Sequence, residues 1–144
     1  MGDRDGRDPQ TRLRVTDMKF NRLVYTEARA AGGGGRSMTV DFELEEITVD
    51  SSGGGVRWCR LGTHERSTVD AKLNSSRPEN WADRYAAPLG DIAWTLKLFD
   101  GTVLVKTSCG TNGFPPAEQW DAFRLLTDFC FTVTRRYGAP PAAS

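Results

Sequence analysis

The sequence predicts a single α+β domain, in which an antiparallel β-sheet of about four to six strands carries a C-terminal amphipathic helix on one face. Three observations predict this fold. Residues 92–109 alternate apolar and polar side chains around Asp100-Gly101, residues 116–137 repeat apolar side chains at helical spacing, and earlier segments are rich in β-branched and aromatic residues. A chain of 144 residues with 38% hydrophobic and 26% charged content is typical of one globular domain.

We expect that domain to span residues 15–138, between two disordered tails. Residues 1–14 begin with a run that is almost wholly charged, Gly, Pro or polar, and such a run cannot bury enough apolar area to offset the entropy of ordering. Residues 139–144 are rich in Pro and Ala and follow Gly138, which suits the C-cap of a helix.

The first sheet segments are residues 19–28 and 38–50, which predict a long hairpin joined by the glycines 32–35. Within 38–50 the apolar side chains change parity, since Met38 and Val40 alternate out of step with Ile47 and Val49. A β-bulge near Glu45-Glu46 is the simplest device for that change.

A third strand is predicted at 56–61, where Arg57 and Arg60 would lie opposite acidic side chains of the preceding strand. Residues 62–89 give the weakest pattern. A short strand at 68–73 and one or two helical turns at 78–86, with Ser76 as N-cap, are the expected elements there.

The hairpin at 92–109 has a register that follows from its turn. If Asp100-Gly101 are the central residues of a type I′ turn, Leu98 faces Val103, Trp94 faces Thr107 and Ile92 faces Cys109. One face of the hairpin then becomes almost wholly apolar, as a strand pair that packs against a helix requires.

The C-terminal helix carries its apolar residues within about one third of its circumference, which indicates one buried stripe. That stripe contains Phe123, Leu126, Phe129, Cys130, Val133 and Tyr137. Trp120 and Phe131 lie together just outside it. Either they are buried elsewhere in the domain, or they offer an apolar strip to a partner. We therefore take Trp120 and Phe131 as candidate partner-binding residues.

A resemblance to an uncharacterised bacterial family rests on residues 94–129, where a D-G hairpin precedes the pattern G-x-N-x-F-P and a helix. The matching positions include Gly110, Asn112, Phe114 and Pro115. The order of elements also looks like that of emfourin-type inhibitors of bacterial metalloproteases, which would imply an inhibitory role. The bacterial family implies no catalytic residues. Its motif also has a structural explanation as a bend into the helix.

Charge and cysteine content limit the classes of partner and compartment. Lys+Arg and Asp+Glu both total 19, so the basic surplus that drives nucleic-acid binding is missing. No apolar run reaches the roughly 18 residues of a membrane span, and no signal peptide is recognisable. Three cysteines without an export signal suit reduced thiols. We expect a cytoplasmic protein that needs no cofactor and binds neither nucleic acid nor membrane.

Several residue groups invite a catalytic or ligand-binding interpretation. Cys59 and His64 with Asp70 would make a thiol nucleophile with its base, although their spacing requires a bend at Gly62. Asp41 and Glu43 begin a run of carboxylates at spacing two that is suited to acid–base chemistry or a cation. The glycine loop lacks the lysine of a phosphate loop, and the cysteines lack the close pairs of a zinc site.

Trp58, Trp81 and Trp94 line either a ligand cleft or the core. We assign Trp94 to the core and leave Trp58 and Trp81 open, as we do the role of His64.

Three hypotheses of function follow. The favoured one is a non-catalytic protein-binding module, an inhibitor or accessory subunit that contacts another protein or a second copy of itself, because no coherent catalytic set is present. The second is a small cytoplasmic enzyme that uses Cys59 or the acidic strand with Asp41 and Glu43. The third is a structural subunit of a larger assembly.

Overall fold

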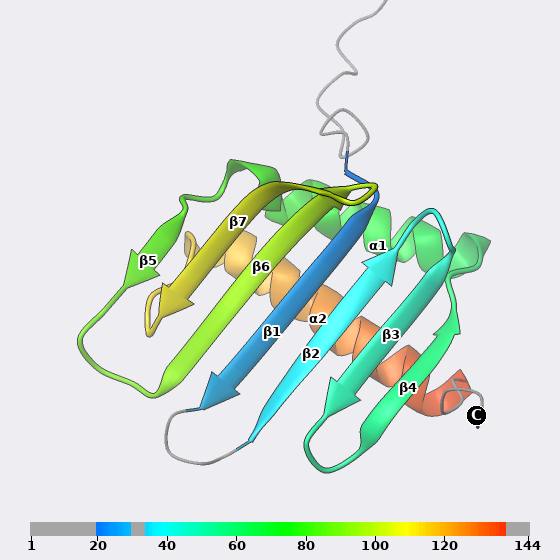
Figure 1. Cartoon of the computed structure of the whole chain (residues 1–144), viewed down its shortest axis with the longest axis horizontal. Coiled ribbons are helices and arrows are strands. Elements are labelled where there is room, and N and C mark those ends of the chain that lie inside the picture. Colours follow the sequence, from blue (N-terminus) through cyan, green and yellow to red (C-terminus); the bar gives the residue numbers. More distant parts are fainter. Residues whose placement is uncertain (1–19, 30–33, 138–144) are drawn as a thin grey trace, which may run out of the picture.

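The computed structural model describes residues 20–29 and 34–137, and at Tyr137 it describes the backbone alone. The tails predicted at 1–14 and 139–144 lie outside these residues, as do residues 30–33 of the glycine loop. The fold class is confirmed in outline, because the described residues form a sheet with the C-terminal helix packed on it (Figure 1).

The sheet has seven strands within the described residues, in the order β4-β3-β2-β1-β6-β7-β5. Their bounds are β1 Arg22–Arg29, β2 Gly35–Asp41, β3 Glu46–Ser51, β4 Gly55–Arg60, β5 Arg84–Ala86, β6 Ile92–Asp100 and β7 Val103–Thr111. Neighbouring strands are antiparallel except β5 and β7, which pair in parallel. The prediction of four to six antiparallel strands was therefore too low by at least one strand, and it missed the parallel pair.

Two α-helices, α1 (Thr63–Ser76) and α2 (Ala117–Tyr137), lie side by side on one face of the sheet. Figure 1 shows them behind the strands, while the opposite face of the sheet has no helix over it. Neither helix is long and apolar enough to cross a membrane, and the same holds for every helix in the described part of the chain.

The extra strand comes from residues 38–50, which fold as β2 and β3 joined by a turn rather than as one bulged strand. Asp41 Oδ1 accepts the backbone N–H groups of Glu43 and Leu44 at 3.0 and 2.8 Å, and Glu45 adopts a φ of 57°. The parity change was correctly located. Its cause is a reversal of the chain, which puts Val40 directly opposite Ile47 in the core.

The strand predicted at 68–73 is wrong, because these residues lie inside α1. Only Val69, Leu73 and Ser76 of that helix are buried. Two apolar residues four apart among Ser, Thr and charged side chains give little helical periodicity, so the tertiary contact with α2 decides the structure here. The helical turns predicted at 78–86 are confirmed only as the 3-10 helix η3 (Pro78–Asn80), whose N-cap is Arg77, not Ser76. The prediction is wrong at residues 84–86, which form the strand β5.

The β6–β7 hairpin exists, but the register predicted for it is wrong. Asp100 pairs with Val103, so the turn centres on Gly101-Thr102, with Gly101 at a φ of 64°. Beyond the turn Leu98 pairs with Lys106 while Phe99 pairs with Leu104, which leaves Val105 as the extra residue of a β-bulge.

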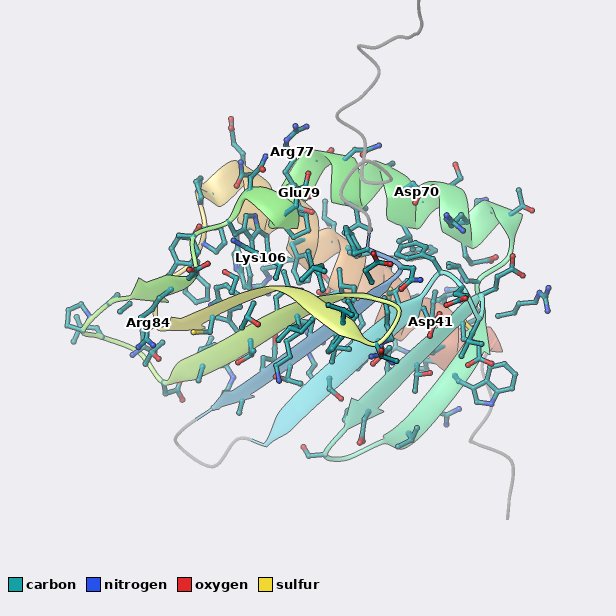
Figure 2. The ribbon with its side chains drawn as sticks, turned by 45° about the horizontal axis from the view of Figure 1, so that its top comes forward. Asp41, Asp70, Arg77, Glu79, Arg84 and Lys106 are labelled. Atoms are coloured by element: carbon teal, nitrogen blue, oxygen red, sulfur yellow. The ribbon has the colours of Figure 1, made fainter. Side chains whose placement is uncertain are left out.

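The bulge changes which face each β7 side chain occupies. Lys106 moves to the helix side, where its Nζ donates to the carbonyl of Trp81 at 2.5 Å and pairs with Asp83 at 3.4 Å (Figure 2). Cys109 moves to the open face opposite Thr95, so the prediction that it faces the core beside Ile92 is wrong.

The junction between β7 and α2 is a bend held by backbone and side-chain hydrogen bonds. Asn112 has a φ of 60°, and its Oδ1 accepts the N–H of Ile92 at 2.9 Å. Gly110 and Gly113 have no positive φ. A Cβ at Gly110 would overlap Trp94, whose Nε1 donates to the Gly113 carbonyl at 2.8 Å. A Cβ at Gly113 would overlap the backbone of Tyr85 and Ala86.

An aromatic cluster fills the core between the sheet and the helices. Trp81 and Trp94 are each 2% exposed, and their rings meet edge to face with centroids 5.7 Å apart. Both contact the ring of Trp120, and Trp81 also contacts that of Phe123. The assignment of Trp94 to the core is confirmed, and Trp81 joins it. Trp58 instead lies on the open face of the sheet, 37% exposed.

Candidate functional site

The proposed nucleophile set does not assemble. Cys59 is buried on the helix side of β4, whereas His64 is exposed in the first turn of α1. Asp70 forms an ion pair with Arg66 one turn away at 3.4 Å, and Figure 2 shows it on α1. No hydrogen bond among the described residues joins these three side chains. Cys59 lies in β4, whereas His64 and Asp70 lie in α1, which begins directly after Gly62.

Burial raises the pKa of the Cys59 thiol, and the carboxylate of Glu65 adds to the shift. A raised pKa leaves less thiolate at neutral pH than a free peptide thiol carries. We therefore expect Cys59, in a variant with Cys109 and Cys130 replaced by Ser, to react with iodoacetamide several-fold more slowly than a model peptide at pH 7.5. The rate should rise as pH increases toward the raised pKa.

Unfolding in urea should restore the model-peptide rate, and this serves as the internal control of the alkylation experiment. If folded Cys59 reacts as fast as the peptide or faster, its thiol is not protected by burial, and the result would support the enzyme hypothesis instead. Burial raises the pKa of Cys130 as well, and Cys130 is 0% exposed. Both thiols therefore have the properties of buried structural residues.

The acidic strand does not present carboxylates on one face either. Asp41 caps the turn described above, Glu43 accepts from the Asn21 amide at 3.4 Å, and Glu45 pairs with Arg60 at 3.1 Å. The last contact confirms the expected pairing of Arg60 with this acidic run. No group of three His, Cys, Asp or Glu side chains in the described ranges is placed to hold a metal ion.

A polar cavity lies between α2 and the ends of β1 and β2. It has a volume of about 230 Å³. We call it the arginine cleft, and it is lined by Tyr25, Glu27, Arg29, Arg36, Ile92, Phe114, Trp120, Arg124 and Thr127. In Figure 1 the end of β1 and the start of β2 lie past α2, toward the lower edge of the sheet.

The helix contributes a single stripe to the cleft. Trp120, Arg124 and Thr127 follow the spacing i, i+4, i+7, which places them on one face of α2, and Phe131 continues the stripe at i+11. Trp120 and Phe131 are thus about 16 Å apart along the helix axis, at nearly the same angle around it. This relation explains why the two residues lie together outside the main core stripe.

The strands contribute a polar extension of the buried face. Leu23 and Tyr25 of β1 point into the core, and Glu27 and Arg29 continue the same alternation beyond it. Arg36 of β2 lies directly across from Glu27, and its Nε pairs with Glu27 Oε2 at 3.0 Å. Arg29 pairs with Asp91 at 3.2 Å.

Tyr25 sits where the aromatic core meets these charges. Its hydroxyl donates to Glu27 Oε1 at 2.8 Å. Burial and the nearby carboxylate of Glu27 raise the pKa of Tyr25 far above its usual value, although Arg36 and Arg124 oppose the shift. The phenol is therefore protonated at neutral pH, so Glu27 is held by a phenol on one oxygen and a guanidinium on the other.

Phe131 supports the cleft from outside it. The Arg36 guanidinium carbon lies 4.6 Å from the centre of the Phe131 ring, a cation–π contact that orients Arg36 along α2. The structure thus places Trp120 in the wall of the cleft and Phe131 behind one of its cations. Both are partly buried, and their exposed edges face the same side of the helix.

Sequence reasoning missed the cleft arginines. Arg29 and Arg36 flank the glycine loop, and the period-two alternation of residues 22–29 would have placed Glu27 and Arg29 on the core-facing side. Charged residues in phase with a buried face are the available signal. Arg124 gives no such signal, because exposed helical arginines are common.

A second groove lies between the start of α1 and the C-terminal half of α2, with a volume of about 460 Å³. It is lined by His64, Glu65, Phe129, Thr132, Val133 and Arg136. The groove is larger and most of its exposed lining is apolar. The polar side chains that border it, from His64, Glu65, Thr132 and Arg136, make no hydrogen bond or ion pair with one another among the described residues. We therefore take the arginine cleft as the candidate site.

Comparison with known proteins does not assign a function. The chain matches no protein-family model, and no curated protein is significantly similar to it in sequence. The resemblances to the bacterial family and to the emfourin-type inhibitors therefore stay predictions, and function has to be argued from the cleft.

Proposed function

We propose that this protein is a non-catalytic protein-binding module, an inhibitor or accessory subunit, that contacts its partner along the Trp120–Phe131 side of α2. The observation that carries the proposal is the convergence of three arginines and three aromatic rings, from two strands, a helix and the junction before that helix, around one cavity. Arginine and tryptophan are the residue types enriched at the energetic centres of protein interfaces.

The chemistry of the cleft favours binding over catalysis. Glu27 is engaged at both oxygens, Tyr25 holds its proton, and guanidinium groups do not deprotonate in proteins. The phenol of Tyr25 therefore does not exchange its proton near pH 7, and the arginines act as fixed cations. A cytoplasmic setting is part of the proposal, supported by three cysteines without disulfides, and a bacterial origin is part of it through the sequence resemblance alone. The proposal also includes a partner that is not nucleic acid, given the zero net charge.

The test is co-precipitation of the tagged full chain from its native cells, followed by binding with the purified partner. We expect Arg124→Glu to abolish recovery of the partner, because position 124 is exposed and the substitution reverses charge without disturbing the core. Trp120→Ala and Phe131→Ala should reduce recovery at least fivefold.

Trp58→Ala is the matched control, since Trp58 is the exposed tryptophan of the opposite face. It should leave recovery unchanged. Equal recovery with all variants would overturn the proposal. Loss with Trp58→Ala alone would instead favour the structural-subunit hypothesis, with the open face of the sheet as the contact.

A further inference from the structure

We infer that the arginine cleft recognises a carboxylate with an aromatic or aliphatic group beside it. The inference deepens the proposed function and rests on it, because it specifies which group of the partner enters the cleft. Two sources supply this chemistry, the free C-terminus of a chain and the side chain of an Asp or Glu next to an apolar residue.

The charge of the cleft suits one negative charge. The cleft holds three cations, from Arg29, Arg36 and Arg124. Two of them are paired, Arg29 with Asp91 and Arg36 with Glu27. A single positive charge therefore remains. Asp121 and Asp128 lie one turn from Arg124 but do not line the cleft. A carboxylate neutralises a surplus of one, whereas a phosphate group, with a charge near −2 at pH 7, exceeds it.

Arg124 supplies that surplus charge. Within the described residues no ion pair or hydrogen bond engages its guanidinium, while Arg29 and Arg36 are each paired. The opposing influence of Arg124 on the pKa of Tyr25 places its charge near the phenol inside the cleft. A guanidinium presents two parallel N–H donors that match the two oxygens of a carboxylate.

An apolar wall of the cleft lies beside Arg124 and can contact the apolar part of the ligand. The rings of Phe114 and Trp120 lie with centroids 5.0 Å apart, and Phe114 is 37% exposed. Ile92 completes this wall. An aromatic or aliphatic side chain next to the carboxylate would cover these groups, and a carboxylate on a fully polar segment would leave them in water.

Phe131 acts as a positioning residue in this arrangement. Its contact with Arg36 fixes a guanidinium that also holds Glu27, so the ring keeps Glu27 away from Arg124. Without the ring Arg36 would gain freedom, and Glu27 would compete with the ligand for Arg124.

The experiment measures affinities of the purified full chain for four fluorescein-labelled peptides by anisotropy. One ends in Gly-Phe with a free carboxylate, one carries an internal Glu-Phe with an amidated end, one is neutral with Gln-Phe and an amidated end, and one carries phosphoserine-Phe with an amidated end. We expect one of the two carboxylate peptides to bind at least tenfold more tightly than the neutral peptide. Which of the two binds identifies the source.

Arg124→Gln should remove that preference, while Arg135→Gln, an exposed arginine outside the cleft, should leave it intact. Phe131→Leu should weaken carboxylate binding about fivefold, and Phe131→Tyr, which retains the ring face, should restore it. Thermal unfolding of each variant, unchanged for the two arginine variants, shows that the affinities refer to folded protein.

Equal binding of neutral and carboxylate peptides, or tighter binding of the phosphoserine peptide, would overturn the inference. The proposed function fails separately, when co-precipitation is unaffected by Arg124→Glu, Trp120→Ala and Phe131→Ala. If these variants lose the partner but removal of the carboxylate does not weaken binding, the proposed function stands and the inference about the carboxylate is wrong.

Discussion

Trp81→Ala is expected to lower the free energy of unfolding by about 3 to 5 kcal/mol, enough to unfold a marginal domain. Trp81 is 2% exposed and its ring contacts those of Trp94, Trp120 and Phe123. Its Nε1 also donates to the Ser76 carbonyl at 2.9 Å, which ties the end of α1 to the core. Truncation removes both the packing and the partner of a buried carbonyl.

The measurement is urea denaturation followed by far-UV circular dichroism, because the substitution itself alters tryptophan fluorescence. Trp58→Ala is the matched control, and it should cost about 1 kcal/mol, since Trp58 already exposes 37% of its surface. Similar losses for the two variants would show that the aromatic cluster does not carry the stability assigned to it.

Gly110→Ala is expected to cost about 2 to 6 kcal/mol, the sum of overpacking and of a lost buried hydrogen bond. A Cβ atom at Gly110 would overlap Trp94 Nε1 and the carbonyl oxygen of Gly113. These two atoms are the donor and acceptor of one hydrogen bond, so the indole has to leave both its partner and its place in the cluster.

Gly53→Ala provides the comparison, because a Cβ at Gly53 meets nothing within 4 Å, and its effect should stay within about 0.5 kcal/mol. The double variant Gly110→Ala/Trp94→Phe should lose less than the two single variants together, since the smaller ring leaves room for the methyl group. Additive losses would mean that the strain at Gly110 has another origin.

The cleft shows how far sequence reasoning reached toward the site. Helical periodicity is a local property, so it could place Trp120 and Phe131 at the edge of the core stripe, where the structure has them partly buried. Their role in partner binding stays a prediction. Arg29, Arg36 and Arg124 were missed, because their convergence depends on how β1, β2 and α2 meet in space. A single charged side chain on a strand or helix does not predict a binding site. It indicates one only when the tertiary structure places other charged side chains beside it.

The sequence by itself determined the elements whose signals are local. The existence of the β6–β7 hairpin follows from its alternation and from the glycine at its turn, although that turn centres on Gly101-Thr102. The helix α2 follows from its apolar stripe and the Pro116 that precedes it. The parity change between Val40 and Ile47 is local too, but the single bulged strand predicted from it is in fact two antiparallel strands joined by a turn.

Tertiary structure alone decided α1, the register of β7 and the cleft. The helix α1 has too few apolar residues to specify itself and is stabilised by packing against α2. The bulge at Val105 changes the side of β7 on which each later residue lies, and it permits Lys106 to reach Trp81. These three features depend on contacts between residues distant in sequence, and local propensity does not predict such contacts.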